Sequence, residues 1–341
     1  MRRGRRGLPQ RAGWTRRRLI GTLLGLLPAL VAGPAAAQVR WVMATEYPAS
    51  TVSGVGLTTF ARRVSERTQG AVEVANALDN ALKISSGEMI RAAQDGRISG
   101  GDAFAGPLEA TDPIFGLASL PFVVQSVEAA RDLNARARPL YARALAARGL
   151  TLLYMTIWPP TGLWTARPLA GPDDLRAMAI RAYDPTSAEV MRAAGAKAEF
   201  MPFSEAVAKV RSRDLDGILT SGDGGAGRRL WDDLRYFTAI NYAIPISLAV
   251  VRTDAVEALP PAQREAVLAA AAETEQSQFA LLATRTADNY ARMRANGVAI
   301  AEPAPPALLA SLRAGAAGPI RAWARKVPEE AVAILDGAGP R

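Results

Sequence analysis

Hydrophobic residues recur at two different spacings along the chain, and the change from one to the other predicts strands that alternate with helices. Residues 178–222 show this most clearly, because three short apolar runs enclose two segments with helical spacing. Such alternation is typical of a parallel α/β unit. Asp184 and Pro185 predict the start of the first helix, where a side-chain acceptor caps free N–H groups and proline needs none. Gly195 predicts its end.

The same reasoning gives elements for the rest of the chain. Strands are expected at residues 39–44, 72–75, 152–158 and 298–301, with a long extended run at 236–252. Helices are expected at 55–68, 87–94, 127–147, 228–234 and 260–295, with one or two more in 303–341. Pro139 predicts a break in the helix that contains it. Ser204 is expected to cap the helix that begins after Pro202.

No stretch between these elements is long enough to act as a linker between independent domains, and the sequence contains no internal repeat. The chain of 341 residues is nevertheless long enough for two domains. We therefore expect two lobes joined by strands that cross from one to the other.

Residues 1–37 have the layout of an export signal. Eight arginines and no acidic residue are followed by an apolar stretch and by an alanine triplet at 35–37. Residues 15–20 resemble a twin-arginine signal, and the general export route remains an equal alternative. An uncleaved anchor would also fit the length, but the Gly, Pro and Ala content argues against it. We expect cleavage near Ala37 and a periplasmic mature protein.

The charge balance changes once this segment is set aside. Of the 41 basic residues, eight lie in it, so 33 remain against 32 acidic residues. A nearly neutral mature chain gives no reason to expect nucleic acid as a partner. The sequence also lacks cysteine and histidine. That excludes disulfides, thiol nucleophiles, imidazole bases and the usual zinc sites, and no cofactor or metal is expected.

Arg181 is the first candidate for a functional residue, because it ends a strand that is otherwise apolar. Ligands in open α/β sheets bind beyond the carboxyl ends of strands, and a guanidinium there can hold a carboxylate with two hydrogen bonds. The alternative is a structural salt bridge from Arg181 to Asp184 or Glu199.

Five aromatic residues lie near predicted strand ends or turns: Tyr47, Trp158, Trp164, Tyr183 and Tyr242. Each one alone is best explained by core packing. Together, and beside a strand-end arginine, they predict an apolar pocket with a few polar groups for a small ligand.

Two other patterns carry less weight. Gly222, Gly224 and Gly227 match the spacing of a dinucleotide-binding loop, but no acidic residue follows at the usual distance of about twenty residues. We interpret this run instead as a flexible loop at the mouth of a cleft. Ser204 with Glu205 could be read as a nucleophile and a base, yet without histidine they make a poor hydrolase, and we expect no enzyme.

The order and spacing of these features resemble the DctP-type solute receptors of TRAP transporters, the tripartite ATP-independent uptake systems. The matching blocks cover most of the mature chain, and they lie at residues 47–48, 60–70, 87–96, 112–122, 174–181, 195–205, 215–217 and 259–260. Each block is weak alone, whereas their order together is specific.

The resemblance implies an α/β, two-lobe fold like that of periplasmic binding proteins, with hinge strands and a long helix across both lobes. Lobe I is expected at 38–160 with 254–303, lobe II at 161–253, and helices packing on the lobes at 304–341. The function implied is a receptor that closes on a small organic-acid ligand and delivers it to the TRAP membrane permease subunits. A receptor of another importer class is the alternative, and an exported enzyme a more remote one.

Arg181 falls on the arginine that pairs with the ligand carboxylate in this family. The other residues expected at the site are Tyr183, Trp158, Trp164, Thr161, Thr220, Ser221, Tyr47, Phe104 and Tyr242. Two departures from the family pattern bear on the ligand. Trp164 stands where relatives often have a second arginine, and Ile218, Leu219 and Thr220 replace polar residues. We therefore expect a monocarboxylate with an apolar or aromatic body rather than a dicarboxylate or a sialic acid.

Overall fold

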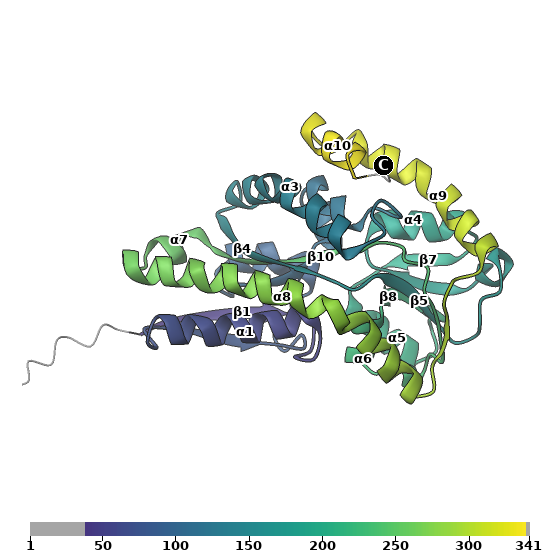
Figure 1. The fold of residues 1–341 in the computed structure, drawn as a ribbon, viewed down its shortest axis with the longest axis horizontal. Coiled ribbons are helices and arrows are strands. Elements are labelled where there is room, and N and C mark those ends of the chain that lie inside the picture. The colour runs from purple at the N-terminus through teal and green to yellow at the C-terminus, as the bar shows by residue number, and fades with distance from the viewer. Residues whose placement is uncertain (1–37, 339–341) are drawn as a thin grey trace, which may run out of the picture. The chain divides into compact units, whose positions relative to one another are not determined.

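The computed structural model describes residues 38–338, which form two mixed β-sheets with helices packed on them (Figure 1). The export signal expected at residues 1–37 lies outside this part of the chain. Between residues 38 and 338, none of the helices combines the length and the hydrophobicity that a membrane crossing needs.

Lobe I is built on a five-stranded sheet of order β2-β1-β3-β10-β4. Its strands are β1 (Val39–Thr45), β2 (Val72–Ala77), β3 (Gly100–Phe104), β4 (Leu150–Ile157) and β10 (Ile246–Arg252). All run parallel except β10, which is antiparallel to both of its neighbours. Its helices are α1 (Val52–Arg67), α2 (Met89–Gln94), α3 (Val127–Ala146) and α7 (Thr253–Glu257).

Side-chain alternation along these strands decides which helices cover each face of the sheet. On β1, Trp41 and Met43 pack into one apolar cluster with Leu57 of α1 and Val267 of the long helix α8 (Pro261–Ala295). Ala44 belongs to the cluster on the other face, which α2 and α3 cover. Both faces are therefore buried, as expected for a mostly parallel sheet.

Lobe II is built on a six-stranded sheet of order β11-β9-β5-β8-β6-β7. Its strands are β5 (Thr161–Thr165), β6 (Ala179–Ala182), β7 (Lys197–Phe200), β8 (Gly217–Ser221), β9 (Tyr236–Thr238) and β11 (Ala299–Ala301). The helices between them are α4 (Pro185–Ala193), α5 (Phe203–Arg211) and α6 (Gly222–Gly227). Asp184 caps α4 with an Oδ1···N distance of 2.6 Å to Ser187, which confirms the predicted helix start.

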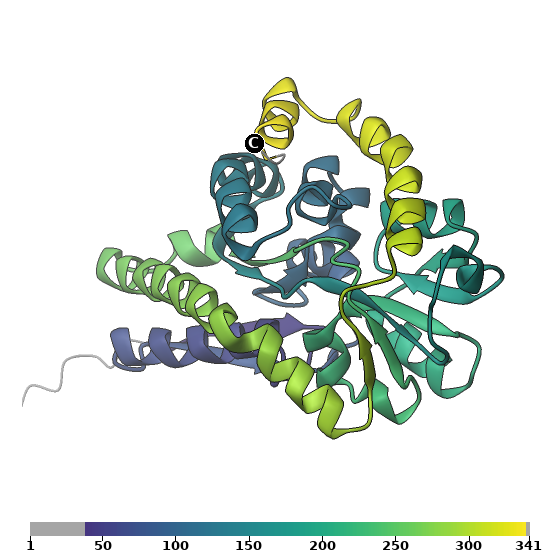
Figure 2. The ribbon, with the colours of Figure 1, turned by 45° about the vertical axis from the view of Figure 1, so that its right-hand side comes forward.

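The chain passes between the two sheets three times. The segments 158–160 and 239–245 are short and lie side by side: Trp158 N donates to Pro245 O at 2.8 Å, and Tyr242 N donates to the O of Thr161, the first residue of β5, at 2.9 Å. The third passage is α8, which contacts α1 and β4 of lobe I and α6 and β11 of lobe II (Figures 1 and 2). This arrangement confirms two lobes with a long helix spanning both.

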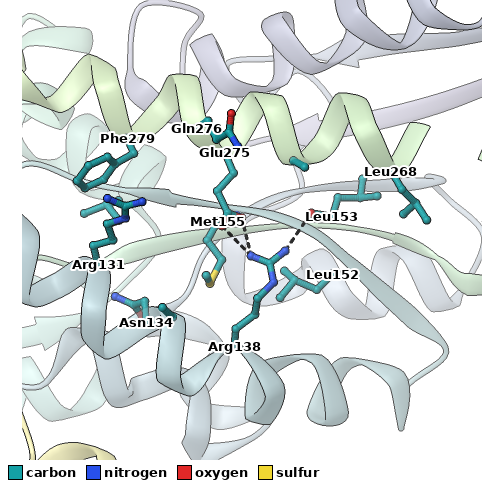
Figure 3. A pocket seen from close by; sticks show the side chains of 13 residues that line it. Arg131, Asn134, Arg138, Leu152, Leu153, Met155, Leu268, Glu275, Gln276 and Phe279 are labelled. Atoms are coloured by element: carbon teal, nitrogen blue, oxygen red, sulfur yellow. Dashed lines mark hydrogen bonds and ion pairs between the residues drawn. The ribbon is translucent and has the colours of Figure 1, made fainter. Parts of the chain in front are cut away.

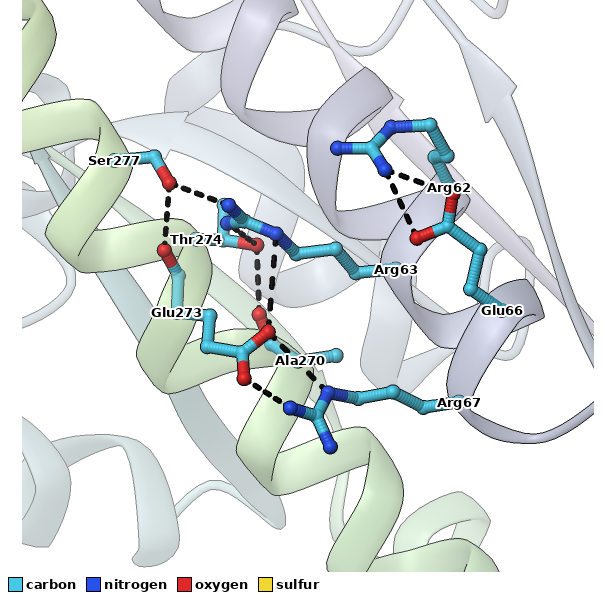
Figure 4. A network of polar contacts seen from close by, with 8 residues as sticks. All are labelled: Arg62, Arg63, Glu66, Arg67, Ala270, Glu273, Thr274 and Ser277. Carbon is cyan, nitrogen blue, oxygen red and sulfur yellow. Dashed lines mark hydrogen bonds and ion pairs between the residues drawn. The ribbon is translucent and has the colours of Figure 1, made fainter.

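Helix α8 is fastened to lobe I by a row of polar contacts with α1 (Figure 4). Arg67 pairs with Glu273, and Arg63 Nη2 donates to Ser277 Oγ at 2.6 Å. The same arginine reaches Thr274 Oγ1 at 3.3 Å. These contacts lie along little more than one turn of α8 and attach this part of the helix to lobe I.

The C-terminal helices also connect the lobes. Helix α9 (Pro306–Ala324) packs against α4 of lobe II, and α10 (Glu329–Asp336) packs against α3 of lobe I. Trp323 Nε1 donates to Pro113 O at 2.7 Å, and Arg143 pairs with Glu330.

Strand pairing places two strands differently from the expected lobe boundaries. Residues 161–253 were expected in lobe II, but β10 lies in the sheet of lobe I between β3 and β4. Residues 254–303 were expected in lobe I, but β11 pairs with β9 in lobe II. The extended run expected at 236–252 is two strands, β9 and β10, which belong to different sheets. Each correction has the same cause, since hydrogen-bond partners far apart in sequence decide where a strand belongs.

Three local predictions were wrong for reasons of packing. The glycine run forms helix α6 instead of a flexible loop; Ser221 caps the helix, which packs so closely on Trp164 that a Cβ on Gly225 would stand 2.2 Å from its ring. Pro139 lies inside the continuous helix α3, whose two halves both bury apolar residues. Ser204 lies within α5, which begins after Pro202, and its own N–H donates to Glu46 of lobe I at 3.1 Å.

Candidate functional site

Eight of the ten predicted site residues line one small cavity where the lobes meet. They come from both sheets and from the first crossing segment, together with Pro245 of the second: Tyr47, Phe104, Trp158, Thr161, Arg181, Tyr183, Thr220 and Ser221. The cavity has a volume of about 10 Å³, which is room for roughly one water molecule. The lobes are therefore in contact around it.

Arg181 lies at the end of β6 with 3% of its surface exposed. Two backbone carbonyl groups hold its guanidinium: Nε donates to Met201 O at 3.0 Å and Nη1 to Leu219 O at 3.3 Å. The ring of Phe203 lies 5.4 Å from the guanidinium carbon. Within residues 38–338 no carboxylate oxygen lies within salt-bridge distance, so the alternative of a salt bridge to Asp184 or Glu199 is not realised.

Burial lowers the pKa of Arg181, while the nearby Tyr47, Glu46 and Asp184 act in the opposite direction. An arginine starts from so high a pKa that it stays charged at neutral pH. Glu46 does not neutralise it by direct contact, because its oxygens already accept from Ser204 N, Ser86 N and Ser86 Oγ, each at 3.1 Å. A buried guanidinium held by neutral carbonyl groups is suited to an incoming anion.

Aromatic rings form the walls beside this charge. The ring centroid of Tyr47 lies 4.7 Å from that of Trp158, and the centroid of Phe104 lies 5.2 Å from that of Tyr183. Trp158 is fixed in place because its Nε1 donates to Ser247 Oγ at 2.9 Å. Burial raises the pKa values of Tyr47 and Tyr183, so both phenols stay neutral.

Paired strands supply the polar wall. Thr161 on β5 lies opposite Ser221 on β8, and Thr220 precedes Ser221. The Ser221 hydroxyl accepts from Gly224 N at 3.2 Å and so caps α6. Of these three hydroxyl groups, that of Ser221 is therefore partly engaged by the fold itself.

Two predicted site residues do not line the cavity. Trp164 is fully buried on the opposite face of β5 from Thr161, where it packs against Phe237 with ring centroids 5.4 Å apart. The strand pleat alone separates positions three residues apart in this way, so the sequence already held this signal. Tyr242 is also fully buried, and it lies behind Tyr183 with centroids 6.1 Å apart. Sequence reasoning missed Pro245 and Phe203.

A larger cavity of about 660 Å³ lies in lobe I, between α3, β4 and α8 (Figure 3). Its cations already have partners. Arg138 pairs with both oxygens of Glu275 at 2.6–2.8 Å, and the guanidinium of Arg131 lies 4.3 Å from the ring centroid of Phe279. None of the predicted site residues lines it. The small interlobe cavity is thus the better candidate, because it contains the buried cation that lacks a counter-ion.

Comparison with known proteins agrees with this geometry. The family model described as bacterial extracellular solute-binding protein, family 7 (DctP), matches residues 43–317. A solute-binding protein of Chromohalobacter salexigens is 23% identical over 262 residues, which is 76% of this chain and 78% of that protein.

Solved structures match over nearly their whole length. DctP7 of Bordetella pertussis, an extracytoplasmic solute receptor binding pyroglutamic acid, gives a TM-score of 0.84 at 28% identity and covers 88% of this chain and 99% of that one. A marine metagenome TRAP solute binding protein specific for pyroglutamate gives 0.83 at 25% identity, with 88% and 98% coverage. These relatives are receptors and not enzymes. The chain thus belongs to the DctP family of bacterial extracellular solute-binding proteins.

Proposed function

We propose that this protein is the extracytoplasmic receptor of a TRAP uptake system and that its ligand is a compact monocarboxylate with a ring or a branched apolar body. One observation carries the proposal: among residues 38–338, the buried guanidinium of Arg181 hydrogen-bonds to two carbonyl oxygens and has no carboxylate oxygen within salt-bridge distance. A ligand carboxylate would supply the missing negative charge. The charge pair formed would be almost fully desolvated, so both its strength and its specificity would be high.

The walls of the cavity favour a compact, mostly apolar body on that carboxylate. Tyr47, Phe104, Trp158 and Tyr183 surround the space, and burial of apolar surface contributes about 25 cal/mol per Å². Trp164 and Ile218, which the sequence suggested as further contacts, lie outside the lining.

The charge distribution argues against a second carboxylate. Arg181 is the one cation among the residues that line the cavity. A dicarboxylate would bury its second charge without a partner, at a cost of several kcal/mol. Succinate and malate are therefore expected to bind weakly.

Two similar receptors support this ligand class. DctP7 and the metagenome receptor, at 28% and 25% identity, bind pyroglutamate, which is a monocarboxylate on a five-membered ring. Neighbours with bound glucuronate or succinate are 20% and 16% identical, so they inform the fold alone. We take pyroglutamate as the first compound to test.

The remaining parts of the proposal follow from the family. The ligand would be delivered to the membrane permease subunits of the same system, and the export signal at residues 1–37 would bring the mature protein to the periplasm. The binding residues proposed are Arg181 for the carboxylate, the four aromatic side chains for the body, and Thr161, Thr220 and Ser221 for any polar group on it.

Isothermal titration calorimetry with pyroglutamate, small hydroxy and aryl acids, succinate and glucuronate tests the proposal. Arg181→Ala should keep the fold and weaken binding roughly a hundred- to several-thousand-fold, since loss of one partner of a desolvated pair costs about 3–5 kcal/mol. Arg181→Lys should lose most of the affinity because the planar fork is gone. Arg138→Lys, in the larger cavity, is the matched control and should bind normally.

Two results would contradict the proposal. Near-native binding by Arg181→Ala would show that the carboxylate is held elsewhere. Tightest binding of a dicarboxylate by the wild-type protein would leave the receptor function standing but refute the ligand class.

A further inference from the structure

A second group of buried polar atoms lies where the lobes touch, outside the lining of the ligand cavity. It contains Asp184 of lobe II and the short 3-10 helices η2 (Gly106–Ala110) and η3 (Pro113–Ser119) of lobe I. Asp184 and Ser187 are fully buried and Ser119 is 1% exposed. The ligand site described above uses none of these side chains.

The second oxygen of Asp184 points at lobe I and receives no hydrogen bond. Oδ1 accepts from Ser187 N and caps α4, whereas Oδ2 has no donor among residues 38–338. A Cβ built on Gly106 would stand 2.9 Å from this oxygen and 3.1 Å from Ser119 Oγ. The carboxyl group is therefore sealed by backbone and side chains of the opposite lobe, and it would be uncovered when the lobes separate.

Glu109 brings a second carboxyl group to the same contact. It is half-buried on η2, and both of its oxygens accept from the hydroxyl of Thr186 at 3.1–3.2 Å. Thr186 lies two residues after Asp184, at the start of α4. Closure of the lobes thus brings two acids, one from each lobe, near each other, and Asp184 is fully buried there.

The charges around these two carboxyl groups do not fully offset the cost of burying them in ionised form. Arg181 favours the ionised form of Asp184, but burial and Glu109 oppose it. Glu109 faces Glu189 on α4 and the exposed Lys326 after α9, which act in opposite directions. Tyr183 and Tyr242, whose phenol pKa values burial raises, are the other titratable groups nearby, and they remain neutral.

We propose that Asp184 and Glu109 form a proton-binding site at the lobe contact, which takes up a proton when the lobes close on a ligand. The inference rests on the proposed receptor function, because it needs lobes that open and close. A protonated carboxyl group has no charge to desolvate, so burial at the lobe contact favours the protonated form. Closure of the lobes is therefore more favourable at low pH than at high pH.

Burial supports this reading by raising the pKa of Asp184 to about 7 in the closed form. A solvated aspartate titrates near 3.9. Between these two pH values the closed form therefore binds more protons than the open form. The free-energy difference that favours the closed form grows as the pH falls below about 7 and is absent above it. From pH 8 to pH 5.5 the affinity for ligand should rise by up to about thirty-fold. A ligand carboxylate remains ionised over this range.

The composition of the chain makes the effect easy to isolate. The sequence has no histidine and no cysteine, so few groups other than the terminal amine and perturbed acids titrate between pH 5.5 and 8. Asp102 is the second such acid: it is fully buried inside lobe I, and burial raises its pKa to about 7 as well. Because Asp102 stays buried when the lobes move, it serves as a matched control.

Calorimetry with pyroglutamate in buffers of different ionisation enthalpy measures the protons taken up on binding. We expect about half a proton at pH 7 and about nine-tenths at pH 6. Asp184→Asn keeps a good helix cap and mimics the neutral acid, so its uptake should fall to near zero and its affinity should vary less than about threefold between pH 5.5 and 8. Glu109→Gln should show an intermediate loss, and Asp102→Asn should keep the wild-type pH dependence.

A measurement without ligand separates this inference from the proposed function. Spin labels on cysteines at the exposed Ala81 and Ala208, one in each lobe, report the interlobe distance. The wild-type protein should shift toward the shorter distance from pH 8 to pH 5.5, and Asp184→Asn should not shift. Binding without proton uptake, or the same pH response in wild type and Asp184→Asn, would overturn the proton site. Absence of binding by every acid, with the pH-dependent shift present, would instead overturn the proposed function.

Discussion

Asp223 offers the sharpest test of how the long helix joins the lobes. This residue of α6 is 1% exposed, and its two oxygens accept three hydrogen bonds from two other helices. Oδ1 accepts from Arg285 Nε at 2.5 Å and from Asn289 Nδ2 at 3.0 Å, both on α8, while Oδ2 accepts from Val52 N at 2.8 Å. Val52 begins α1 of lobe I, so one carboxylate ties both lobes and α8 together.

Removal of this carboxylate in Asp223→Ala would leave a mostly buried guanidinium and a buried N–H without their acceptor. Loss of one partner of a buried ion pair costs about 3–5 kcal/mol, and a carboxylate at the start of α1 adds a favourable interaction with the helix dipole. We therefore expect the free energy of unfolding to fall by about 3–5 kcal/mol. Asp223→Asn keeps one acceptor and should lose less.

Urea unfolding followed by tryptophan fluorescence gives this free energy. The matched control is Asp232→Ala, which removes an exposed partner of Arg229 and should cost less than about 1 kcal/mol. If Asp223→Ala lost no more stability than Asp232→Ala, the carboxylate would not join the lobes in the way described.

Two further substitutions test other buried positions. Burial raises the folded-state pKa of Asp102 to about 7, so its contribution to stability is present in acid and is lost as the pH rises through that value. Asp102→Asn should therefore raise the melting temperature relative to wild type more at pH 8 than at pH 5. An equal difference in melting temperature at both pH values would refute this. A Cβ on Gly227 would stand 2.5 Å from Thr51 of lobe I. Gly227→Ala should hence weaken pyroglutamate binding, measured by calorimetry, by about tenfold. The control is Gly171→Ala, whose Cβ meets nothing within 4 Å and which should bind normally. Equal affinities of the two variants would contradict this prediction.

Local signals in the sequence were sufficient for much of the fold. Asp184 with Pro185 predicted the start of α4, Gly195 predicted its end, and two prolines predicted the start of the 35-residue helix α8. These signals work because caps and proline act on the backbone within one turn. The ordered blocks along the chain likewise predicted the family, which the match over residues 43–317 confirms.

The candidate site could be predicted in part because strand ends are local features. Arg181 was recognised as a polar residue that ends an apolar strand, and it lies in the interlobe cavity with seven other residues predicted for the site. Trp164 was expected at the site because it stands where relatives often have a second arginine, and the pleat of β5, which places it on the other face from Thr161, was not considered. Tyr242 was misplaced because a crossing segment has no periodicity to indicate which way a side chain points.

By itself the sequence determined most of the element types, the family and the arginine at the centre of the candidate site, since each depends on residues close together in the chain. Tertiary structure alone decided that β10 joins lobe I, that six residues with four glycines form a helix against Trp164, and that Asp184 and Glu109 meet. Strand partners, the space beside a glycine and the solvation of a carboxyl group are all set by atoms far away in sequence. Only the folded chain brings those atoms together.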